Sequence, residues 1–411
     1  MTRANQIPAA PRHDVVIVGG GMIGLTLGCA LAHVGFEVAV VDRDDPATAT
    51  AAAFDGRASA LAFASQRLLG AIGVWPGLAP AAQPILDIRV SDRESLLRLH
   101  FDHCELDARP FGYMVENRHI RTALHAAVQK WPNLVLHAPR HVVALERGPG
   151  LARAVLDDGG VIEAPLVVAC DGRASSLRAS AGIAARGWTY PQCAIVCTIA
   201  HERPHRGIAH ERFLASGPFA VLPLTGNRAS LVWTERADLA PTFLDLDRAE
   251  FDVEMRRRLG GFLGAAHTIG PRWSYPLAMH HAERYVDHRV VLVGDSAHTV
   301  HPVAGQGLNM GLRDVAALAE VLVDTARLGL DIGTTDRLER YQRWRRLDNL
   351  AMIAVTDVLN RLFVVDGASV ALARDLGLAA VDRLPPLKRF FMRHARGTVG
   401  ALPRLLAGHT P

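Results

Sequence analysis

The stretch "DVVIVGGGMIGLTLGCALAHVGFEVAVVD", residues 14–42, decides the fold class of this chain. Residues 14–18 are a short, β-branched apolar run, which predicts a buried parallel strand. Residues 22–34 are small and apolar and predict a packed helix that ends near Gly35. Residues 37–42 predict a second strand. A strand, a helix and a strand in this order form a βαβ unit, which is typical of an α/β fold.

Three glycines stand between the first predicted strand and the helix, in G-x-G-x-x-G spacing. Gly19 permits the tight turn, Gly21 lets the backbone approach a pyrophosphate, and Gly24 lets helix and strand pack closely. The free N–H groups at the helix start favour phosphate. Asp42, at the end of the second strand, is placed to accept hydrogen bonds from both ribose hydroxyls of an adenosine. The unit therefore predicts a dinucleotide site, but it does not distinguish FAD from NAD.

Two further apolar runs, residues 165–172 and 288–295, resemble the first strand and also lead into Gly/Asp turns. Between them, residues 187–284 contain short apolar runs separated by Gly, Pro and Asn, which predict an antiparallel sheet. Residues 85–92 look like a piece of that same sheet. Beyond Gly305 the apolar residues keep a helical period. The chain thus predicts a nucleotide-binding domain with a β-rich insertion and a helical end.

The stretch "VVLVGDSAHTVHPVAGQGLNMGLRD", residues 290–314, identifies the dinucleotide as FAD. An acid at the end of its strand can bind the ribityl hydroxyls of a flavin, which NAD lacks. The helix that "AGQG" opens would point its N–H groups at the pyrimidine edge of the isoalloxazine. Its positive end favours the charge of the reduced ring by on the order of 0.3–1 kcal/mol. The FAD-binding residues predicted here are Gly294, Asp295, Gly305, Gln306, Gly307, Leu308 and Asn309.

The same stretch resembles the second flavin motif of the para-hydroxybenzoate-hydroxylase-like monooxygenases. More narrowly, it resembles the ubiquinone-biosynthesis hydroxylase family, whose usual string is close to GDAAH-(I/M)-HP-x-AGQG-x-N-x-G-x-x-D. The likeness extends from about residue 14 to beyond 400. The other segments that carry it are "FDGRASALAFASQRLLGAIGVW", "GYMVENRHIRTAL", "CDGRASSLR" and "ERFLASGPFAVLPL".

The resemblance implies roles for several further residues. Arg57 would contact the flavin and the nicotinamide. Asp171 and Gly172 begin the D-G-x-x-S-x-x-R motif, which the family links to both FAD and NAD(P)H and which continues to Ser175 and Arg178. Arg121 stands where many relatives have a Gln near the ribityl chain, and in FAD binding it would reach a phosphate or ribityl oxygen.

The family likeness also implies the reaction. NADPH or NADH would reduce the flavin, and one oxygen atom of O₂ would be transferred to the ring of a prenylated phenol on the path to ubiquinone. The chain has no second G-x-G-x-x-G unit for NAD(P)H. Two alternatives remain open: a flavoprotein dehydrogenase or reductase on the same scaffold, and a non-catalytic flavin-binding member of a quinone-biosynthesis complex.

These expectations divide the chain into three parts, with the FAD-binding domain made of separate segments. The ranges are 1–80, 110–185 and 286–345 for the FAD-binding domain, 81–109 and 186–285 for the β-rich substrate domain, and 346–411 for the C-terminal helical segment.

His301 and Pro302 are the candidate catalytic residues, because they stand in the turn of the second flavin motif. A general acid or base role is the hypothesis for His301, and the Pro302 carbonyl would face the site above the ring. The inserted sheet would form an apolar roof over the flavin. Its candidate lining residues are Trp188, Tyr190, Gln192, Phe213, Phe219, Pro223 and Trp233.

No metal site is predicted. His298 and His301 form an H-x-x-H pair, but no carboxylate or cysteine cluster stands beside them, and the flavin motif already accounts for the turn. The five cysteines are scattered and predict free thiols rather than disulfides. A net charge of +4, evenly spread over most of the chain, gives no support to nucleic-acid binding.

The last part of the chain has no acid after Asp382, while basic and apolar residues alternate. Two interpretations stay open: a helix that packs on its own protein or a sister subunit, and an interfacial element that meets anionic lipid. The polar start and the lack of a long apolar run predict a cytoplasmic protein, with peripheral membrane attachment and homo-oligomerisation left open.

Overall fold

The computed structural model describes most of the chain. The described residues are 12–51, 56–93, 98–301, 305–364, 374, 377 and 379–411. Pro302, one of the candidate catalytic residues, lies outside them, as does Asp55 of the "FDGRASAL" segment.

The dinucleotide-binding unit is built on a six-stranded sheet with the order β18-β19-β12-β1-β2-β8. All neighbours are parallel except β18 and β19, and the chain-wide prediction of an α/β fold is confirmed. Helix α1 (Met22–Ala32) follows β1 directly and ends two residues before the predicted end. The strands are β1 (Val15–Val18), β2 (Val38–Val41), β8 (Leu134–His137), β12 (Leu166–Ala169), β18 (Val286–Asp287) and β19 (Val290–Leu292).

A second, eight-stranded sheet has the order β20-β17-β13-β16-β15-β14-β5-β6 and confirms the mostly antiparallel insertion. The exception is β5, which joins β14 in parallel and so brings residues 87–92 into this sheet as expected. The strands are β5 (Asp87–Asp92), β6 (Arg98–Asp102), β13 (Ala185–His201), β14 (Ile208–Leu214), β15 (Gly217–Leu224), β16 (Arg228–Arg236), β17 (Ala266–Ala282) and β20 (His298–Thr299).

Two three-stranded sheets were not foreseen from the sequence. One has the order β3-β7-β4 and the other β11-β10-β9. Because β4 pairs with β7, the segment 81–109 contributes to two different sheets, and the division into domains stays a proposal. The strands are β3 (Ala58–Ala62), β4 (Gln83–Ile85), β7 (Gly112–Glu116), β9 (Val142–Arg147), β10 (Ala152–Leu156) and β11 (Val161–Ala164).

The large sheet has two differently covered faces. One face packs on α7 (Ala240–Asp245) and α8 (Arg248–Leu259), where Phe251 and Met255 are fully buried. We call this the outer face. The opposite face, called the inner face, is turned to α10 (Thr335–Val364) and to β3. Alternation along each strand decides which side chains reach which face.

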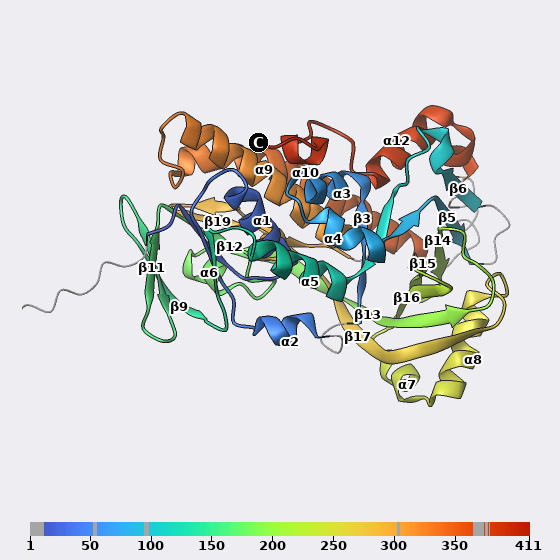
Figure 1. Ribbon diagram of the computed structural model, residues 1–411. Helices are drawn as coiled ribbons and strands as arrows, with labels where there is room; N and C mark the ends of the chain where they lie inside the picture. The colour runs from blue at the N-terminus through green and yellow to red at the C-terminus, as the bar shows by residue number, and fades with distance from the viewer. Residues whose placement is uncertain are drawn as a thin grey trace, which may run out of the picture.

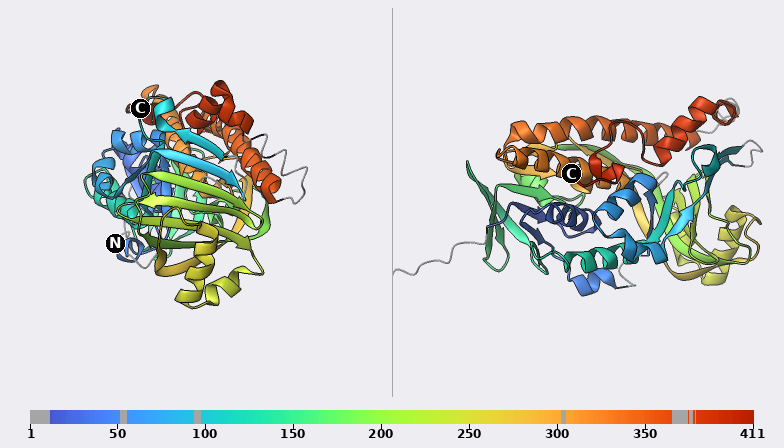
Figure 2. Two further views of the ribbon diagram at one scale, coloured as in Figure 1. Left: turned by 90° about the vertical axis from the view of Figure 1, so that its right-hand side faces the viewer. Right: turned by 45° about the horizontal axis from the view of Figure 1, so that its top comes forward.

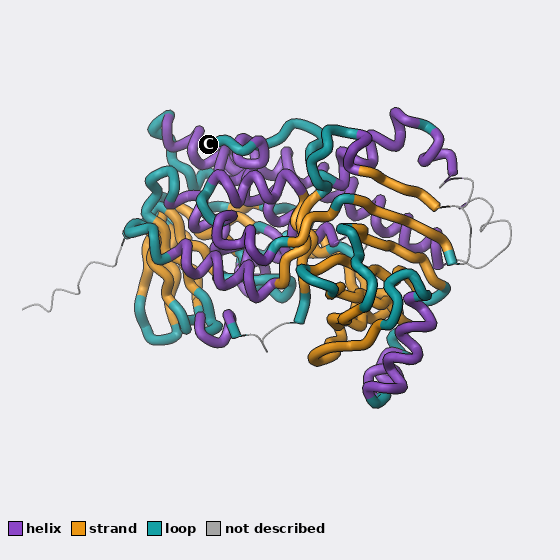
Figure 3. Tube along the Cα trace, turned by 45° about the vertical axis from the view of Figure 1, so that its right-hand side comes forward, coloured by secondary structure: helices purple, strands orange, loops and turns teal. Residues whose placement is uncertain are grey.

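Helix α10 connects the two main parts of the molecule. It contacts α9 (Gln306–Arg327) and β18 at one end and reaches β14 and β15 at the other. Figure 1 and the right-hand view of Figure 2 show this long helix running beside α9 toward the large sheet. Figure 3 shows groups of strands toward both ends of the molecule, with many of the helices between them.

The remaining helices are short or lie at the periphery. They are α2 (Pro46–Thr50), α3 (Phe63–Ala71), α4 (Trp75–Leu78), α5 (Asn117–Val128), α6 (Ser176–Ser180) and α12 (Pro385–Ala395), with the 3-10 turns η1 (Ala79–Ala81), η2 (His103–Glu105), η3 (Gly294–Ser296) and η5 (Arg404–Ala407). Among the described residues, no helix combines the length and the apolarity that crossing a bilayer requires.

Candidate flavin and substrate site

The first glycine turn fits a pyrophosphate. At Gly19, φ is +105°, and an added Cβ would lie 2.3 Å from the carbonyl oxygen of Cys170. At Gly24 an added Cβ would lie 1.8 Å from the carbonyl oxygen of Gly19. Gly21 differs, because a Cβ there meets no atom within 4 Å. Packing thus requires two of the glycines, while Gly21 keeps the start of α1 open to a bulky anion.

Asp42 lies at the end of β2, next to this turn. A Cβ on Gly20 would come within 2.6 Å of its Oδ2, and the Asp44 N–H donates a hydrogen bond to its Oδ1 at 3.0 Å. Burial raises the pKa of Asp42, and the amides of Asp44 and Gly20 act against that shift. This position beside the glycine turn fits the predicted role, and the contact with the adenosine ribose stays a prediction.

Asp295 stands in η3, directly after Gly294, whose φ of +67° makes the sharp turn. Its side chain is exposed, yet burial raises its pKa, while the charges of His298, Arg57 and Arg173 lower it. The carboxylate is therefore surrounded by protein but keeps accessible oxygens. This is the arrangement that binding of ribityl hydroxyls requires.

A fully buried ion network lies behind this turn. The Gly294 N–H donates to Asp314 Oδ2 at 3.1 Å, and His298 Nε2 lies 2.5 Å from the same oxygen. Arg345 Nε donates to Asp314 Oδ1 at 2.7 Å, and Asn349 binds Arg345 and the hydroxyl of Tyr285. Burial alone would raise the pKa of Asp314, but the charges of His298 and Arg345 hold it well below its usual range. Helices α9 and α10 thus fix the position of the flavin motif.

The partners of Asp314 were missed by the sequence analysis. Arg345 and Asn349 stand outside every motif, and helical periodicity does not distinguish them from the surface residues of α10. One signal was present: a buried aspartate in the G-x-x-D end of the motif needs a cation.

The start of α9 is the predicted contact with the isoalloxazine. Gly305 is its N-cap with φ of +60°, and Gln306, Gly307 and Leu308 form the first turn, whose N–H groups have no partner within the helix. A helix of 22 residues also directs its positive dipole end here. These features fit a flavin that carries negative charge when reduced.

Asn309 has a different place from the one predicted. Its Oδ1 accepts hydrogen bonds from the Ala62 N–H and the Ser65 hydroxyl, both at 2.8 Å, and its Nδ2 donates to the Ala60 carbonyl at 2.7 Å. The side chain is thus engaged in holding β3 and α3 against α9. Its FAD contact stays a prediction, with the backbone as the group still able to provide it.

The two arginines assigned by resemblance lie in different environments. The Arg57 guanidinium lies 4.8 Å from the centre of the Tyr275 ring and is close enough to Asp295 to lower its pKa. It therefore lies at the flavin motif, beside the large sheet. Arg121 is buried, with 7% of its surface exposed, on α5, which packs beside α1.

The D-G motif is tied to the second flavin motif. Asp171 accepts a hydrogen bond from the Leu177 N–H at 3.3 Å, and Gly172 has φ of +82°. Ser175 is the N-cap of α6, and Arg178 Nη1 donates to the Ser296 carbonyl at 2.8 Å. Arg178 thus connects the segment after β12 to the turn after β19, while Asp171 holds the start of α6.

His301 and His298 do not form a pair. His298 is bound to Asp314, whereas His301 is fully buried and packs edge-on against Tyr190, with 5.0 Å between ring centres. Neither ring nitrogen of His301 has a hydrogen-bond partner within the described part of the chain. Burial lowers the pKa of His301 to about 4, so the ring is neutral at pH 7.

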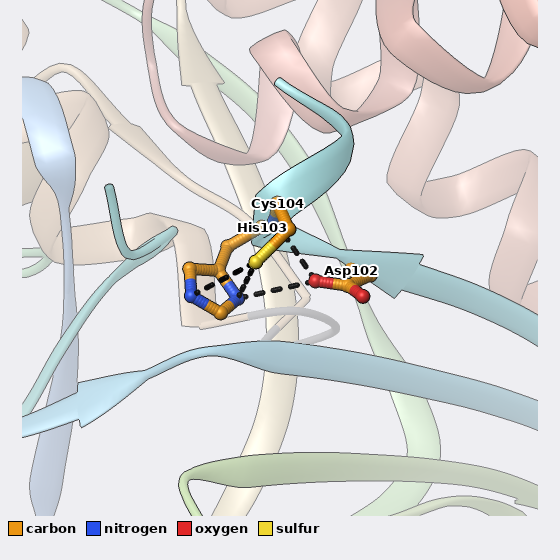
Figure 4. A group of neighbouring side chains, drawn as sticks. All are labelled: Asp102, His103 and Cys104. Atoms are coloured by element: carbon orange, nitrogen blue, oxygen red, sulfur yellow. Dashed lines mark hydrogen bonds and ion pairs between the residues drawn. The ribbon is translucent and has the colours of Figure 1, made fainter. Parts of the chain in front are cut away.

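A group of potential metal ligands stands outside the flavin motifs, at Asp102, His103 and Cys104 (Figure 4). Asp102 Oδ1 accepts a hydrogen bond from the Cys104 N–H at 2.8 Å and lies 3.3 Å from His103 Nδ1. Capping of the η2 turn accounts for the carboxylate position. The sequence-based expectation of no metal stays a prediction.

All five cysteines are free thiols, as predicted.

The predicted roof of the site is wrong for Phe219 and Trp233. Trp233 and Phe219 point to the outer face and pack with Phe251 of α8, away from the flavin motif. Alternation then places their neighbours Val232 and Ala220 on the inner face. Tyr190 does lie near the flavin motif, against His301. Aromatic residues suit the roof of such a site, but strand register directs these two side chains to the outer face. The sequence alone did not provide that register.

The chain is similar to known proteins over nearly its whole length. The family model described as FAD binding domain matches residues 12–354. The ubiquinone hydroxylase UbiL of Rhodospirillum rubrum is 54% identical over 398 residues, covering 96% of this chain and 92% of the relative. The 3-demethoxyubiquinol 3-hydroxylase of Escherichia coli is 36% identical over 386 residues, covering 93% and 98%.

A solved structure supports the fold independently. The p-nitrophenol 4-monooxygenase PnpA of Pseudomonas putida superposes with a TM-score of 0.78 at 19% identity, covering 95% of this chain and all of that one. With this likeness and both flavin motifs in place, the chain belongs to the FAD-binding domain family and, within it, to the FAD-dependent hydroxylases of ubiquinone biosynthesis.

Proposed function

We propose that this chain hydroxylates a ring carbon of a prenylated phenol on the path to ubiquinone, with NADPH or NADH as electron donor. The observation that carries the proposal is whole-chain identity of 54% to a ubiquinone hydroxylase. Two features of the structure support it: the accessible Asp295 carboxylate, and the inner sheet face that continues toward the flavin motif. Bound FAD would supply the oxygen-activating chemistry.

The residues that hold FAD in this proposal fall into five groups. They are the first glycine turn and ribose acceptor (Gly19, Gly21, Gly24, Asp42), the two arginines (Arg57, Arg121), the D-G motif (Asp171, Gly172), the second turn (Gly294, Asp295) and the start of α9 (Gly305, Gln306, Gly307, Leu308, Asn309). Arg173 and Arg178, within the D-G-x-x-S-x-x-R motif, offer positive charge to the phosphates of a transiently bound NAD(P)H.

For catalysis we retain His301 and Pro302 as candidates. A neutral imidazole can accept a proton, so the lowered pKa of His301 is compatible with a base rather than an acid at pH 7. Its complete burial means that a rearrangement must expose a ring nitrogen before substrate or solvent can reach it.

Deletion of the gene is expected to leave cells poor in ubiquinone and rich in a precursor that lacks one or more ring oxygens. Lipid extracts analysed by mass spectrometry check this. The purified enzyme should in addition incorporate one atom of ¹⁸O₂ into that precursor.

Normal quinone levels, in a strain without a redundant relative, would contradict the pathway. NAD(P)H oxidation without oxygen incorporation would favour the dehydrogenase or reductase alternative, and a flavin that NAD(P)H does not reduce would favour the non-catalytic one.

We also propose that the C-terminal segment attaches the protein to a membrane, but through fewer basic residues than the sequence suggests. Three of its basic residues are engaged inside the protein: Lys388 with Glu105, Arg396 with Asp107, and Arg404 with Asp324. The exposed side of α12 still carries apolar residues beside exposed arginines. These residues are Leu384, Leu387, Phe390, Phe391, Arg389 and Arg393. We propose that this side meets the membrane that holds the prenylated substrate.

Flotation with vesicles tests this attachment. The wild type should float with phosphatidylcholine vesicles that contain phosphatidylglycerol, and less with phosphatidylcholine alone. Arg389→Glu/Arg393→Glu should weaken anionic binding roughly tenfold or more, since each basic residue contributes about 1 kcal/mol at such a surface. Arg337→Glu, on α10, is the matched control.

Deleting residues 383–411 is a poor test, because it removes the buried Met392, Leu405 and Leu406. Equal binding by all proteins would mean that α12 only packs on its own chain.

A further inference from the structure

Glu211, in the middle of β14, is a carboxyl group in an apolar part of the large sheet. Its register partners on the two neighbouring strands are Val90 of β5 and Ala220 of β15. Along its own strand, the residues on the same face are Ala209 and Phe213. The carboxyl group therefore projects from a surface that these four residues make apolar.

The face is the inner one. Phe213 stacks on Phe363 of α10 with 3.7 Å between ring centres. Ala209 belongs to an apolar cluster that includes Leu222 and also Ala60 of β3. A Cβ added to Gly305 would lie 3.3 Å from the Ala60 Cβ. The apolar surface beside Glu211 thus continues to the residue that begins α9, where the flavin ring is expected.

The charge on Glu211 is not compensated by neighbouring groups. Within the described part of the chain, the structure gives it no hydrogen-bond donor and no ion pair, burial is the only influence on its pKa, and it keeps some accessible surface. The charged pair on the same face, Asp92 of β5 and Arg374, is joined at 2.6 Å, and Arg374 also donates to the Leu362 carbonyl. Ala220 of β15, which pairs with Glu211, and Phe363 of α10, which stacks on Phe213, are both uncharged. Burial raises the pKa of Glu211 to about 7.

An uncompensated carboxyl in an apolar wall destabilises the fold, and such groups occur mostly where a ligand uses them. The outer face of the same strand shows the contrast, because Arg212 is satisfied there by the carbonyls at the end of α8. A partner for Glu211 must therefore be a hydrogen-bond donor that enters the inner surface together with apolar groups.

We propose that Glu211 binds the phenolic hydroxyl of the substrate ring and so orients the ring and selects phenols over aryl ethers. The inference rests on the proposed function, because that function requires a phenol beside the apolar inner face. The hydroxyl donates its hydrogen to a carboxylate oxygen, and the prenyl chain and ring pack on the surrounding apolar residues. A methyl ether of the same phenol has no hydrogen to donate and leaves the carboxylate unpaired.

Binding to the FAD-loaded enzyme tests the proposal, with 2-prenylphenol and its methyl ether as probes and flavin absorbance as the readout. The wild type should bind the phenol at least tenfold more tightly than the ether. Glu211→Leu should abolish this preference. Phe213→Leu, on the same face, is the matched control and should weaken both probes alike. A Glu211→Leu enzyme that keeps the preference overturns the proposal.

The pH dependence distinguishes this role from a merely structural one. The preference of the wild type should grow as pH rises through about 7, because the ionised carboxyl is the stronger acceptor. Glu211→Gln should keep part of the preference without that pH dependence, and a pH profile unchanged in Glu211→Gln would contradict the proposal. FAD content and thermal melting establish that each variant is folded. If the wild type forms no hydroxylated product, the proposed function fails, while the binding preference still decides the role of Glu211.

Discussion

Replacing Asp314 by alanine is expected to lower the free energy of unfolding by about 3–5 kcal/mol, because the change leaves buried Arg345 without its counter-ion. Asp314 is fully buried and accepts hydrogen bonds from Gly294, His298 and Arg345. Chemical denaturation of the apo protein measures the loss. The variant should also bind FAD more weakly, since the amide of Gly294 loses the group that holds its turn.

Asp324→Ala is the matched control on the same helix. Asp324 is partly exposed and pairs with Arg340 and Arg404, so its removal should cost roughly 1 kcal/mol or less. If both variants lose similar amounts, the network around Asp314 does not have the role assigned to it.

Replacing Asp295 by alanine should weaken FAD binding roughly ten- to a hundredfold, corresponding to hydrogen bonds worth about 1–3 kcal/mol to a largely buried group. The expected effect on the apo protein is the opposite of that for Asp314. The folded-state pKa of Asp295 is raised, so the ionised carboxylate destabilises the empty fold once pH exceeds its unfolded pKa. Apo Asp295→Ala should therefore be at least as stable as the wild type at pH 7.

Flavin fluorescence quenching and thermal melting measure the two quantities separately. Asp158→Ala, at an exposed turn between β10 and β11, is the control. It should leave FAD affinity unchanged and alter apo stability only slightly, because its contacts with Arg140 and the Gly160 N–H are exposed. Wild-type FAD affinity in Asp295→Ala would remove Asp295 from the cofactor site. A large loss of apo stability would make it a structural residue like Asp314.

The sequence by itself determined the fold class, the cofactor and the family. It could do so because these properties depend on local patterns: three glycines and an acid within one βαβ unit, and a second motif in which Gly294, Asp295 and Gly305 are close along the chain. Each residue of such a motif acts through its own backbone or its immediate neighbours, so spacing is sufficient to recognise it.

Only the tertiary structure decided which side chains face the site. Period-two alternation separates the two faces of a strand, but the packing of α8 and α10 decides which face is inner. That is why Trp233 was wrongly predicted to roof the flavin, and why Glu211 attracted no attention as a site residue. The same holds for Asp314 and Arg345, which are 31 residues apart on different helices. A buried ion pair is a property of packing, and no local pattern encodes the partner.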